Sequence, residues 1–228
     1  MGKFGQRDNP NEFYGINGNM LFMVDPRVAQ KDKVVTGYTY QKPPRLSCIA
    51  TTKEGYIATG SEKGEIRLFN SVSKRAKTLC PGQGHPIIGI DTTAGGEWVL
   101  ATTERYLLLF QTKVPEMTKT GFEASVINKN VSYRTRFVVE VAQPRMVKLT
   151  LKKEDTVRYG IHRVCFSTAR FNSGDDVSED WIITSTGKHL VIWNFAKVKR
   201  GIYDDYFVRI CIFSTLTVNR SEKSKIKS

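Results

Sequence analysis

The sequence predicts an all-β fold built from repeated small sheets, and an internal repeat is the main observation behind this prediction. Each copy has a strand-like run, a polar turn and a second strand-like run that ends on an aromatic residue. The aromatic residues that end the first two copies, Phe69 and Phe110, are 41 residues apart. Helical periodicity is nowhere sustained. The three copies span residues 56–69, 98–110 and 181–193, and further apolar runs precede them at 46–50, 87–91 and 161–166.

A spacing of 41 residues with several strands in each repeat is typical of WD-repeat β-propellers. Their blades have a period of about 40–45 residues and four strands each. The continuous apolar run at residues 107–109 suits a strand that is buried on both faces between neighbouring blades. We therefore predict a WD-repeat-like β-propeller with three blades and a partial one at residues 20–25. We expect an incomplete propeller, because a closed ring needs four or more blades.

The third copy ends at Trp193, which is 83 residues after Phe110 and so close to two periods away. Either a degenerate blade or a long insertion fills this gap, and we favour an inserted basic hairpin with strands at 134–141 and 146–152. Residues 112–130 resemble a surface loop. The predicted organisation is a lead-in with a partial blade strand (1–45), blades with an insertion at about 112–159 (46–201), and an atypical basic tail (202–228).

Basic residues exceed acidic ones by 35 to 22, which gives a formal net charge of +13 and suggests an anionic partner. Many of these charges fall on the predicted hairpin, where period-two alternation groups them on faces of the strands. They suit an acidic protein surface, an anionic lipid or RNA, although an ordinary solvated hairpin explains them equally well. The candidate partner-binding residues are Arg134, Arg136, Arg145, Lys148, Lys152 and Lys153.

No motif indicates catalysis, a cofactor or a metal site. The four cysteines lie far apart without CxxC spacing, and no nucleophile motif accompanies the three histidines, for which structural roles are favoured. No stretch approaches the roughly 20 apolar residues that cross a bilayer. We therefore expect a non-enzymatic, soluble protein without a cofactor. The residues concerned are Cys48, Cys80, Cys165, Cys211, His85, His162 and His189.

Five segments of the sequence resemble one known family. Residues 8–27, 55–68, 74–78, 86–91 and 198–201 are similar to the C-terminal propeller-like domain of the vacuolar import and degradation (Vid) protein family. The similarity is greatest to its plant branch, known as CYPRO-type or defective-embryo-and-meristems proteins. The resemblance weakens after Gly201, and the family's N-terminal region has no counterpart here, so we expect a propeller that is cut short.

The resemblance implies a non-enzymatic protein-interaction scaffold in the cytoplasm, with an unidentified protein partner. In plants it implies a link to embryo and meristem development. The alternative function is electrostatic binding of RNA or anionic lipid through the basic hairpin and tail. Short basic segments also serve as nuclear-import signals, so a nuclear location is the alternative to a cytoplasmic one.

Overall fold

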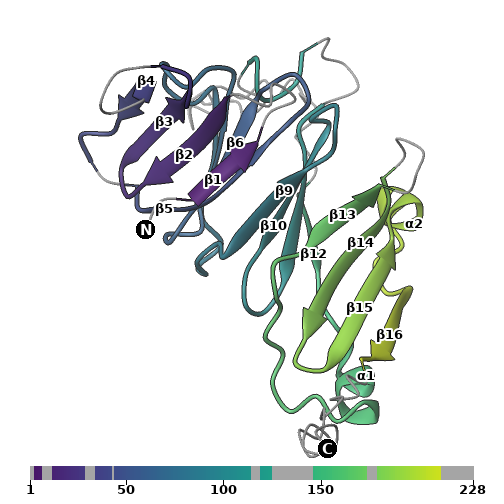
Figure 1. The fold of residues 1–228 in the computed structure, drawn as a ribbon. Coiled ribbons are helices and arrows are strands. Elements are labelled where there is room, and N and C mark those ends of the chain that lie inside the picture. Colours follow the sequence, from purple (N-terminus) through teal and green to yellow (C-terminus); the bar gives the residue numbers. More distant parts are fainter. Residues whose placement is uncertain are drawn as a thin grey trace, which may run out of the picture.

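Four antiparallel sheets of four strands each make up the described part of the chain (Figure 1). The structure, a computed structural model, describes residues 3–6, 12–28, 34–42, 44–113, 119–124, 146–173 and 179–211. Within each sheet the strands are neighbours in sequence order, so every sheet is a simple meander. This is the blade topology of a propeller, and the predicted all-β propeller class is confirmed.

We number the sheets 1 to 4 in chain order. Sheet 1 contains β1 (Lys3–Gln6), β2 (Phe13–Asn17), β3 (Met20–Val24) and β4 (Val34–Thr39). Sheet 2 contains β5 (Leu46–Thr51), β6 (Ile57–Ser61), β7 (Ile66–Phe69) and β8 (Thr78–Cys80). Sheet 3 contains β9 (Gly89–Thr92), β10 (Trp98–Thr102), β11 (Leu107–Gln111) and β12 (Met146–Leu149). Sheet 4 contains β13 (Arg170–Ser173), β14 (Glu179–Thr186), β15 (His189–Asn194) and β16 (Tyr206–Ile210). Two short helices are described, α1 (Lys153–Arg158) and α2 (Phe195–Lys199).

Successive sheets pack face to face, and a hydrophobic cluster fills each of the three interfaces. Because side chains alternate between the two faces of a strand, each inner sheet contributes one set of apolar residues to each neighbour. Tyr14, Leu21, Ile57 and Phe69 belong to the cluster between sheets 1 and 2. Ile66, Leu68, Val99 and Phe110 belong to the next one. Leu100, Leu109, Ile182 and Trp193 belong to the cluster between sheets 3 and 4.

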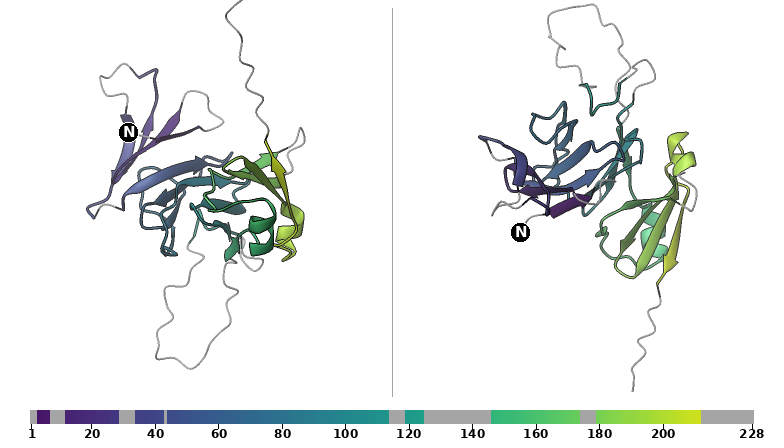
Figure 2. Two further views of the ribbon diagram at one scale, coloured as in Figure 1. Left: turned by 90° about the horizontal axis from the view of Figure 1, so that it is seen from below. Right: turned by 45° about the horizontal axis from the view of Figure 1, so that its top comes forward.

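The sheets follow one another in an open arc. The first strands of successive sheets are neighbours, since β1 contacts β5, β5 contacts β9, and β9 contacts β13. Sheets 1 and 4 lie at the two ends of the arc, and the described strands do not close a ring (Figure 1 and Figure 2). The expectation of an incomplete propeller is therefore confirmed for the described residues.

Sheet 1 differs from the prediction of a single partial strand at residues 20–25. The lead-in forms a complete sheet of four strands, of which the strand at Met20–Val24 is the third. A two-residue turn at Gly18 and Asn19 joins β2 to β3, and Gly18 has a φ of +57°. Two-residue turns that begin with glycine are a hairpin signal, which the 41-residue repeat did not include because it does not extend into this sheet.

Only the second strand of the hairpin predicted at 134–141 and 146–152 lies in the described part of the chain. Met146–Leu149 is β12, which pairs with β11 and completes sheet 3, whereas residues 134–141 lie outside the described residues. Residues 150–159, also placed in the insertion, include helix α1. An insertion therefore separates the third and fourth strands of sheet 3, and no additional blade is needed to explain the long spacing.

The tail predicted to begin at residue 202 also includes part of a blade. Residues 206–210 form β16, which pairs with β15 along its whole length, from Trp193↔Tyr206 to His189↔Ile210. The sequence Tyr-Phe-Val-Arg-Ile is rich in residues that favour strands. The prediction missed it because the outermost strand of a blade contacts only one strand and carries no repeated motif here.

Candidate interaction surface

Three of the six predicted partner-binding residues lie in the described part of the chain. Lys148 is an exposed residue of β12, Lys152 precedes α1, and Lys153 is the first residue of that helix. The other three, Arg134, Arg136 and Arg145, lie outside the described residues. The prediction that all six act together thus remains a prediction, and the surroundings of the three lysines can be examined directly.

Lys148 lies over an aromatic ring. Its Nζ atom is 4.0 Å from the centroid of the Tyr106 ring, a cation–π geometry. Tyr106 follows the turn between β10 and β11 and is only 4% exposed. Its hydroxyl donates a hydrogen bond of 2.9 Å to the Gln83 carbonyl oxygen. Burial and this hydrogen bond hold the ring in place, so the ammonium group of Lys148 lies over a ring with a fixed position.

His85 contacts the same ring, and Arg105 and Lys63 belong to the turns beside it. The His85 ring meets the Tyr106 ring edge to face, with centroids 5.4 Å apart, and Arg105 is the exposed neighbour of Tyr106 in the chain. The turn that carries Lys63 packs against the strand connection at residues 82–85. A Cβ atom added at Gly64 would lie 2.5 Å from the His85 carbonyl oxygen, and Gly64 has a φ of +80°.

We call this cluster the Tyr106 patch, and it consists of Lys63, His85, Arg105, Tyr106 and Lys148. Its three cations have no ion-pair partner among the described residues, whereas Arg45 pairs with Glu62 and Arg163 with Glu104 nearby. Unpaired exposed cations on a well-held loop are suited to an anionic partner. Only Lys148 was predicted; Lys63 and Arg105 were missed, although their position in the turn of each repeat was a usable signal.

Lys152 and Lys153 lie at a different place, where α1 packs against sheet 4. The Tyr206 hydroxyl donates to Asp155 Oδ2 at 2.6 Å and accepts from the Lys152 backbone N–H at 2.7 Å. Burial, and then the bond to Asp155, raises the pKa of Tyr206. The Lys152 ammonium is 3.1 Å from Asp204, and this hydrogen bond lowers the pKa of Asp204. Lys152 is thus already engaged within the fold, and the structure does not bring it to the Tyr106 patch.

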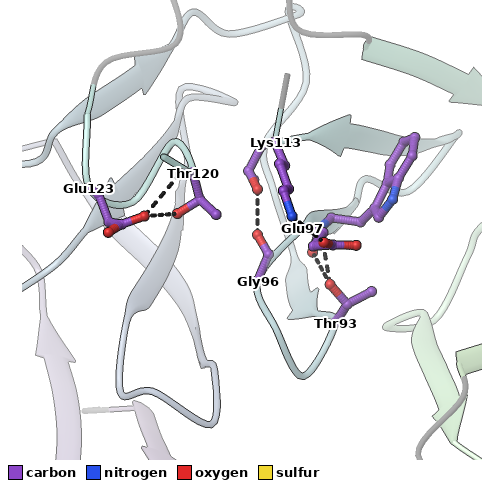
Figure 3. A network of polar contacts seen from close by, with 8 residues as sticks. Thr93, Gly96, Glu97, Lys113, Thr120 and Glu123 are labelled. Atoms are coloured by element: carbon purple, nitrogen blue, oxygen red, sulfur yellow. Dashed lines mark hydrogen bonds and ion pairs between the residues drawn. The ribbon is translucent and has the colours of Figure 1, made fainter. Parts of the chain in front are cut away.

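The described base of the insertion lies where β10 begins and β11 ends, at the end of sheet 3 opposite to the turn that carries Tyr106. Lys113 forms a 3.1 Å ion pair with Glu97, and Glu123 accepts hydrogen bonds from Thr120 (Figure 3). Phe122 is fully buried and stacks on Tyr56, with ring centroids 5.6 Å apart. Residues 119–124 form a turn, in line with the loop predicted at 112–130, but the buried Phe122 anchors this turn in the core.

No arrangement suited to catalysis is present in the described residues. No hydrogen bond there joins His85, His162 or His189 to a nucleophile or an acid, and no group of three potential metal ligands occurs in them. A cavity of about 300 Å³ lies between the first strands of sheets 2, 3 and 4. Its one charged lining residue, Arg170, is 3.3 Å from Asp91.

Asp91 links sheets 3 and 4. It accepts a 2.8 Å hydrogen bond from the Phe171 backbone N–H as well as pairing with Arg170. Burial raises the pKa of Asp91, although both partners favour the ionised form. These contacts hold two sheets together and leave no free acid or base. Within the described chain, neither helix has the length and apolar character needed to span a membrane.

Comparisons with known proteins match the chain to one family model and to propeller structures. Residues 1–213 match the model of the VID27 C-terminal WD40-like domain. The chain is 36% identical over 211 residues to vacuolar import and degradation protein 27 of Schizosaccharomyces pombe, covering 91% of this chain and 25% of that protein. It is 33% identical over 196 residues to the protein of the same name from Saccharomyces cerevisiae, covering 84% and 24%. The chain thus spans about a quarter of the length of these curated relatives.

Two solved structures share the fold at low sequence identity. The β-propeller domain of Cps50 (Swd1) from Myceliophteria thermophila superposes with a TM-score of 0.58 at 15% identity, covering 89% of this chain and 56% of that one. A chain of the mitotic checkpoint complex gives a TM-score of 0.55 at 10% identity, covering 85% and 47%. These likenesses establish the propeller architecture.

Proposed function

Because this chain belongs to the VID27 family through its C-terminal WD40-like domain, we propose that it is a non-enzymatic protein-interaction scaffold. Its Tyr106 patch binds an acidic segment of a partner protein. The observation that carries this proposal is the contact of Lys148 with one firmly held ring, beside two turns whose residues Lys63 and Arg105 also have no acidic partner in the described structure. Loops on a rigid propeller are common binding sites because the scaffold positions them.

The names of the relatives support a setting for this function. Both curated relatives carry the name vacuolar import and degradation protein 27, so we place the scaffold in that process and in the cytoplasm. The link to embryo and meristem development rests on the resemblance to the plant branch and forms part of the same proposal. The insertion residues Arg134, Arg136 and Arg145 are proposed as further contacts.

Two features of the patch favour a protein partner over RNA or a membrane. Tyr106 is 4% exposed, so its ring offers no free face on which a base stacks. The exposed members of the patch are charged and carry no apolar side chain that inserts into a lipid layer.

The proposal is tested with fluorescence anisotropy and a labelled glutamate-rich peptide as the probe. We expect the triple variant Lys63→Glu/Arg105→Glu/Lys148→Glu to bind at least about tenfold more weakly than the wild type, since three attractive contacts become repulsive. The matched control is Lys53→Glu/Lys74→Glu/Arg75→Glu. These three residues are exposed and lie in loops at the opposite end of sheet 2 from Lys63, so the control makes the same change in charge away from the patch.

Equal losses in the patch variant and the control would contradict the proposed site, because they would mean that only net charge matters. The same titrations with single-stranded RNA and with phosphatidylserine-containing vesicles test the alternative function. RNA or vesicle binding that is tighter than peptide binding, and that falls steeply between about 50 and 200 mM salt, would replace the protein-partner proposal with the electrostatic alternative.

A further inference from the structure

Two weak ion pairs flank the Tyr106 patch. Arg45 Nη1 lies 3.6 Å from Glu62 Oε2, and Arg163 Nη2 lies 3.8 Å from Glu104 Oε2. Both distances are too long for a hydrogen bond. The two arginine side chains are 71% and 77% exposed, and the two glutamates are more than half exposed. Because water screens such pairs, they contribute little to stability, and neither arginine is held firmly by its acid.

The acid of each pair belongs to the same turn as a cation of the patch. Glu62 precedes Lys63 in the turn between β6 and β7, and Glu104 precedes Arg105 in the turn between β10 and β11. In each turn the glutamate reaches an arginine outside the patch, while the cation beside it has no acidic partner among the described residues. A carboxylate of the chain itself therefore occupies an arginine on each side of the patch.

Backbone hydrogen bonds hold the segments that carry these arginines beside the two turns. The Glu62 N–H donates to the Arg45 carbonyl oxygen at 2.9 Å. The Phe166 N–H, three residues after Arg163, donates to the Glu104 carbonyl oxygen at 2.8 Å. The backbone thus keeps both arginines next to the patch, and their weak contacts with the glutamates are not needed for this.

Arg45 also has a backbone conformation that does not suit arginine. Its φ is +51°, and it is the one non-glycine residue with a positive φ in the described part of the chain. In this region the Cβ atom of an L-residue crowds the following carbonyl oxygen, so glycine or asparagine is the usual choice. The side chain gives the fold little in return, since its pair with Glu62 is long and exposed. A strained residue that the fold does not need indicates a function.

We infer that Arg45 and Arg163 are outer contacts of the Tyr106 patch, and that Glu62 and Glu104 occupy them until carboxylates of the partner take their place. Because this exchange occurs beside the proposed binding site, it rests on the proposed function. It selects a partner segment in which several acidic residues follow closely on one another. An isolated acid only replaces one weak pair by another. A run of acids that is already bound at the patch presents its next carboxylate to the arginine at a high effective concentration.

Fluorescence anisotropy with the labelled glutamate-rich peptide measures the exchange. We expect Glu62→Gln and Glu104→Gln each to tighten binding about threefold, because each frees an arginine and removes a repulsive carboxylate. Arg45→Gln and Arg163→Gln are each expected to weaken binding about threefold, because each removes an outer contact.

The pair between Lys113 and Glu97 provides the matched controls. Its side chains are also about half exposed, but they lie at the opposite end of sheet 3 from the patch. Glu97→Gln and Lys113→Gln make the same changes in net charge and are expected to alter binding by less than about 1.5-fold, since salt screens charges at that distance. If Glu97→Gln tightened binding as much as Glu62→Gln, net charge alone would explain the effect and the proposal would be overturned.

A double-variant cycle shows whether Glu62 acts through Arg45. If Glu62 holds the arginine, most of the gain from Glu62→Gln is lost when Arg45 is already replaced by glutamine. Equal gains from Glu62→Gln in the wild-type and Arg45→Gln backgrounds would overturn the exchange.

Arg45→Gly tests whether the strained residue serves binding or the fold. We expect this variant to bind the peptide as weakly as Arg45→Gln, with a Tm no lower than that of the wild type, because glycine adopts a positive φ without strain. A lower Tm would show that Arg45 serves the fold and would overturn its assignment as a contact.

The Lys63→Glu/Arg105→Glu/Lys148→Glu variant separates the outer contacts from the proposed function. Loss of binding in that variant, with unchanged binding in Arg45→Gln and Arg163→Gln, would overturn the outer contacts and leave the Tyr106 patch as the site. Unchanged binding in the triple variant would overturn both.

Discussion

At the scale of single residues, the interior depends on close approaches that only small side chains allow. Gly60 in β6 has no room for a methyl group, because an added Cβ atom would lie 2.5 Å from Ile87 Cγ2 and 2.6 Å from Cys48 Sγ. Such a substitution forces neighbouring atoms in a close-packed core to shift. The sequence shows this glycine inside a strand, and only the structure explains why it is there.

Gly60→Ala is therefore expected to lower the free energy of unfolding by about 1–3 kcal/mol, the usual effect of overpacking. Gly95→Ala is the matched control, since its added Cβ atom has no neighbour closer than 4.0 Å. Urea unfolding measures both. Equal stability of the two variants would contradict the close approach of β6 to Ile87.

The cysteines give a second prediction at this scale. Cys80 is fully buried, and burial raises the pKa of its thiol to about 12, whereas Cys165 is exposed. Because the thiolate is the reactive form, we expect a maleimide reagent at pH 7.5 to label Cys165 rapidly and to leave Cys80 unlabelled, even at pH 9. Peptide mapping by mass spectrometry identifies the labelled sites. Labelling of Cys80 at the rate of Cys165 in the folded protein would contradict the burial of β8.

At the scale of elements, the Tyr206 side chain links a short helix to the last sheet. α1 has only six residues and no buried side chain, so its own hydrogen bonds do not stabilise it in isolation. We expect Tyr206→Phe to lower the free energy of unfolding by about 2 kcal/mol, because it removes the bonds to Asp155 and the Lys152 N–H. Tyr159→Phe, which keeps the ring contact with His189, is the control. Equal thermal stability of the two variants would mean that the hydroxyl does not hold α1.

The junction between sheets 3 and 4 is expected to respond to pH. Burial raises the pKa of Asp91 above its ordinary value of 3.8, so its contribution to stability is fully present below that pH and is lost as pH rises through the folded-state pKa. Asp91→Asn removes this titration while an amide oxygen still accepts from Phe171. We therefore expect the Tm of the variant to change less between pH 4 and 7 than that of the wild type. If the Tm of the variant changed with pH as much as that of the wild type, a group other than Asp91 would be responsible for the pH dependence.

The middle strands of sheets 2 to 4 were predictable from the sequence, and several outer strands were not. The second and third strands carry the repeated pattern because their side chains are buried between two neighbouring sheets. β12 and β16 contact only one strand each, so packing restricts their sequences less. Sheet 1 does not follow the repeat, although its hairpin turn at Gly18 and Asn19 is visible in the sequence.

At the scale of the whole molecule, the fold shows where a few of the excess positive charges lie close together. The net charge of +13 suggests an anionic partner. Of the three predicted lysines, only Lys148 lies in the Tyr106 patch. Lys63 and Arg105 are 42 residues apart in the sequence, and only the stacking of sheets 2 and 3 brings their turns together. Sequence alone gave no means of predicting this proximity, because it depends on how the blades are arranged.

The central claim is that this scaffold binds an acidic protein segment at the Tyr106 patch. Photo-cross-linking of a glutamate-rich peptide to the wild-type chain, followed by mass spectrometry, tests it most directly because it locates the contact. We expect cross-links concentrated in residues 62–65, 82–85, 103–106 and 146–149. We expect these cross-links to be lost in the Lys63→Glu/Arg105→Glu/Lys148→Glu variant. Cross-links concentrated instead around α2 or residues 70–77, unchanged in that variant, would contradict it.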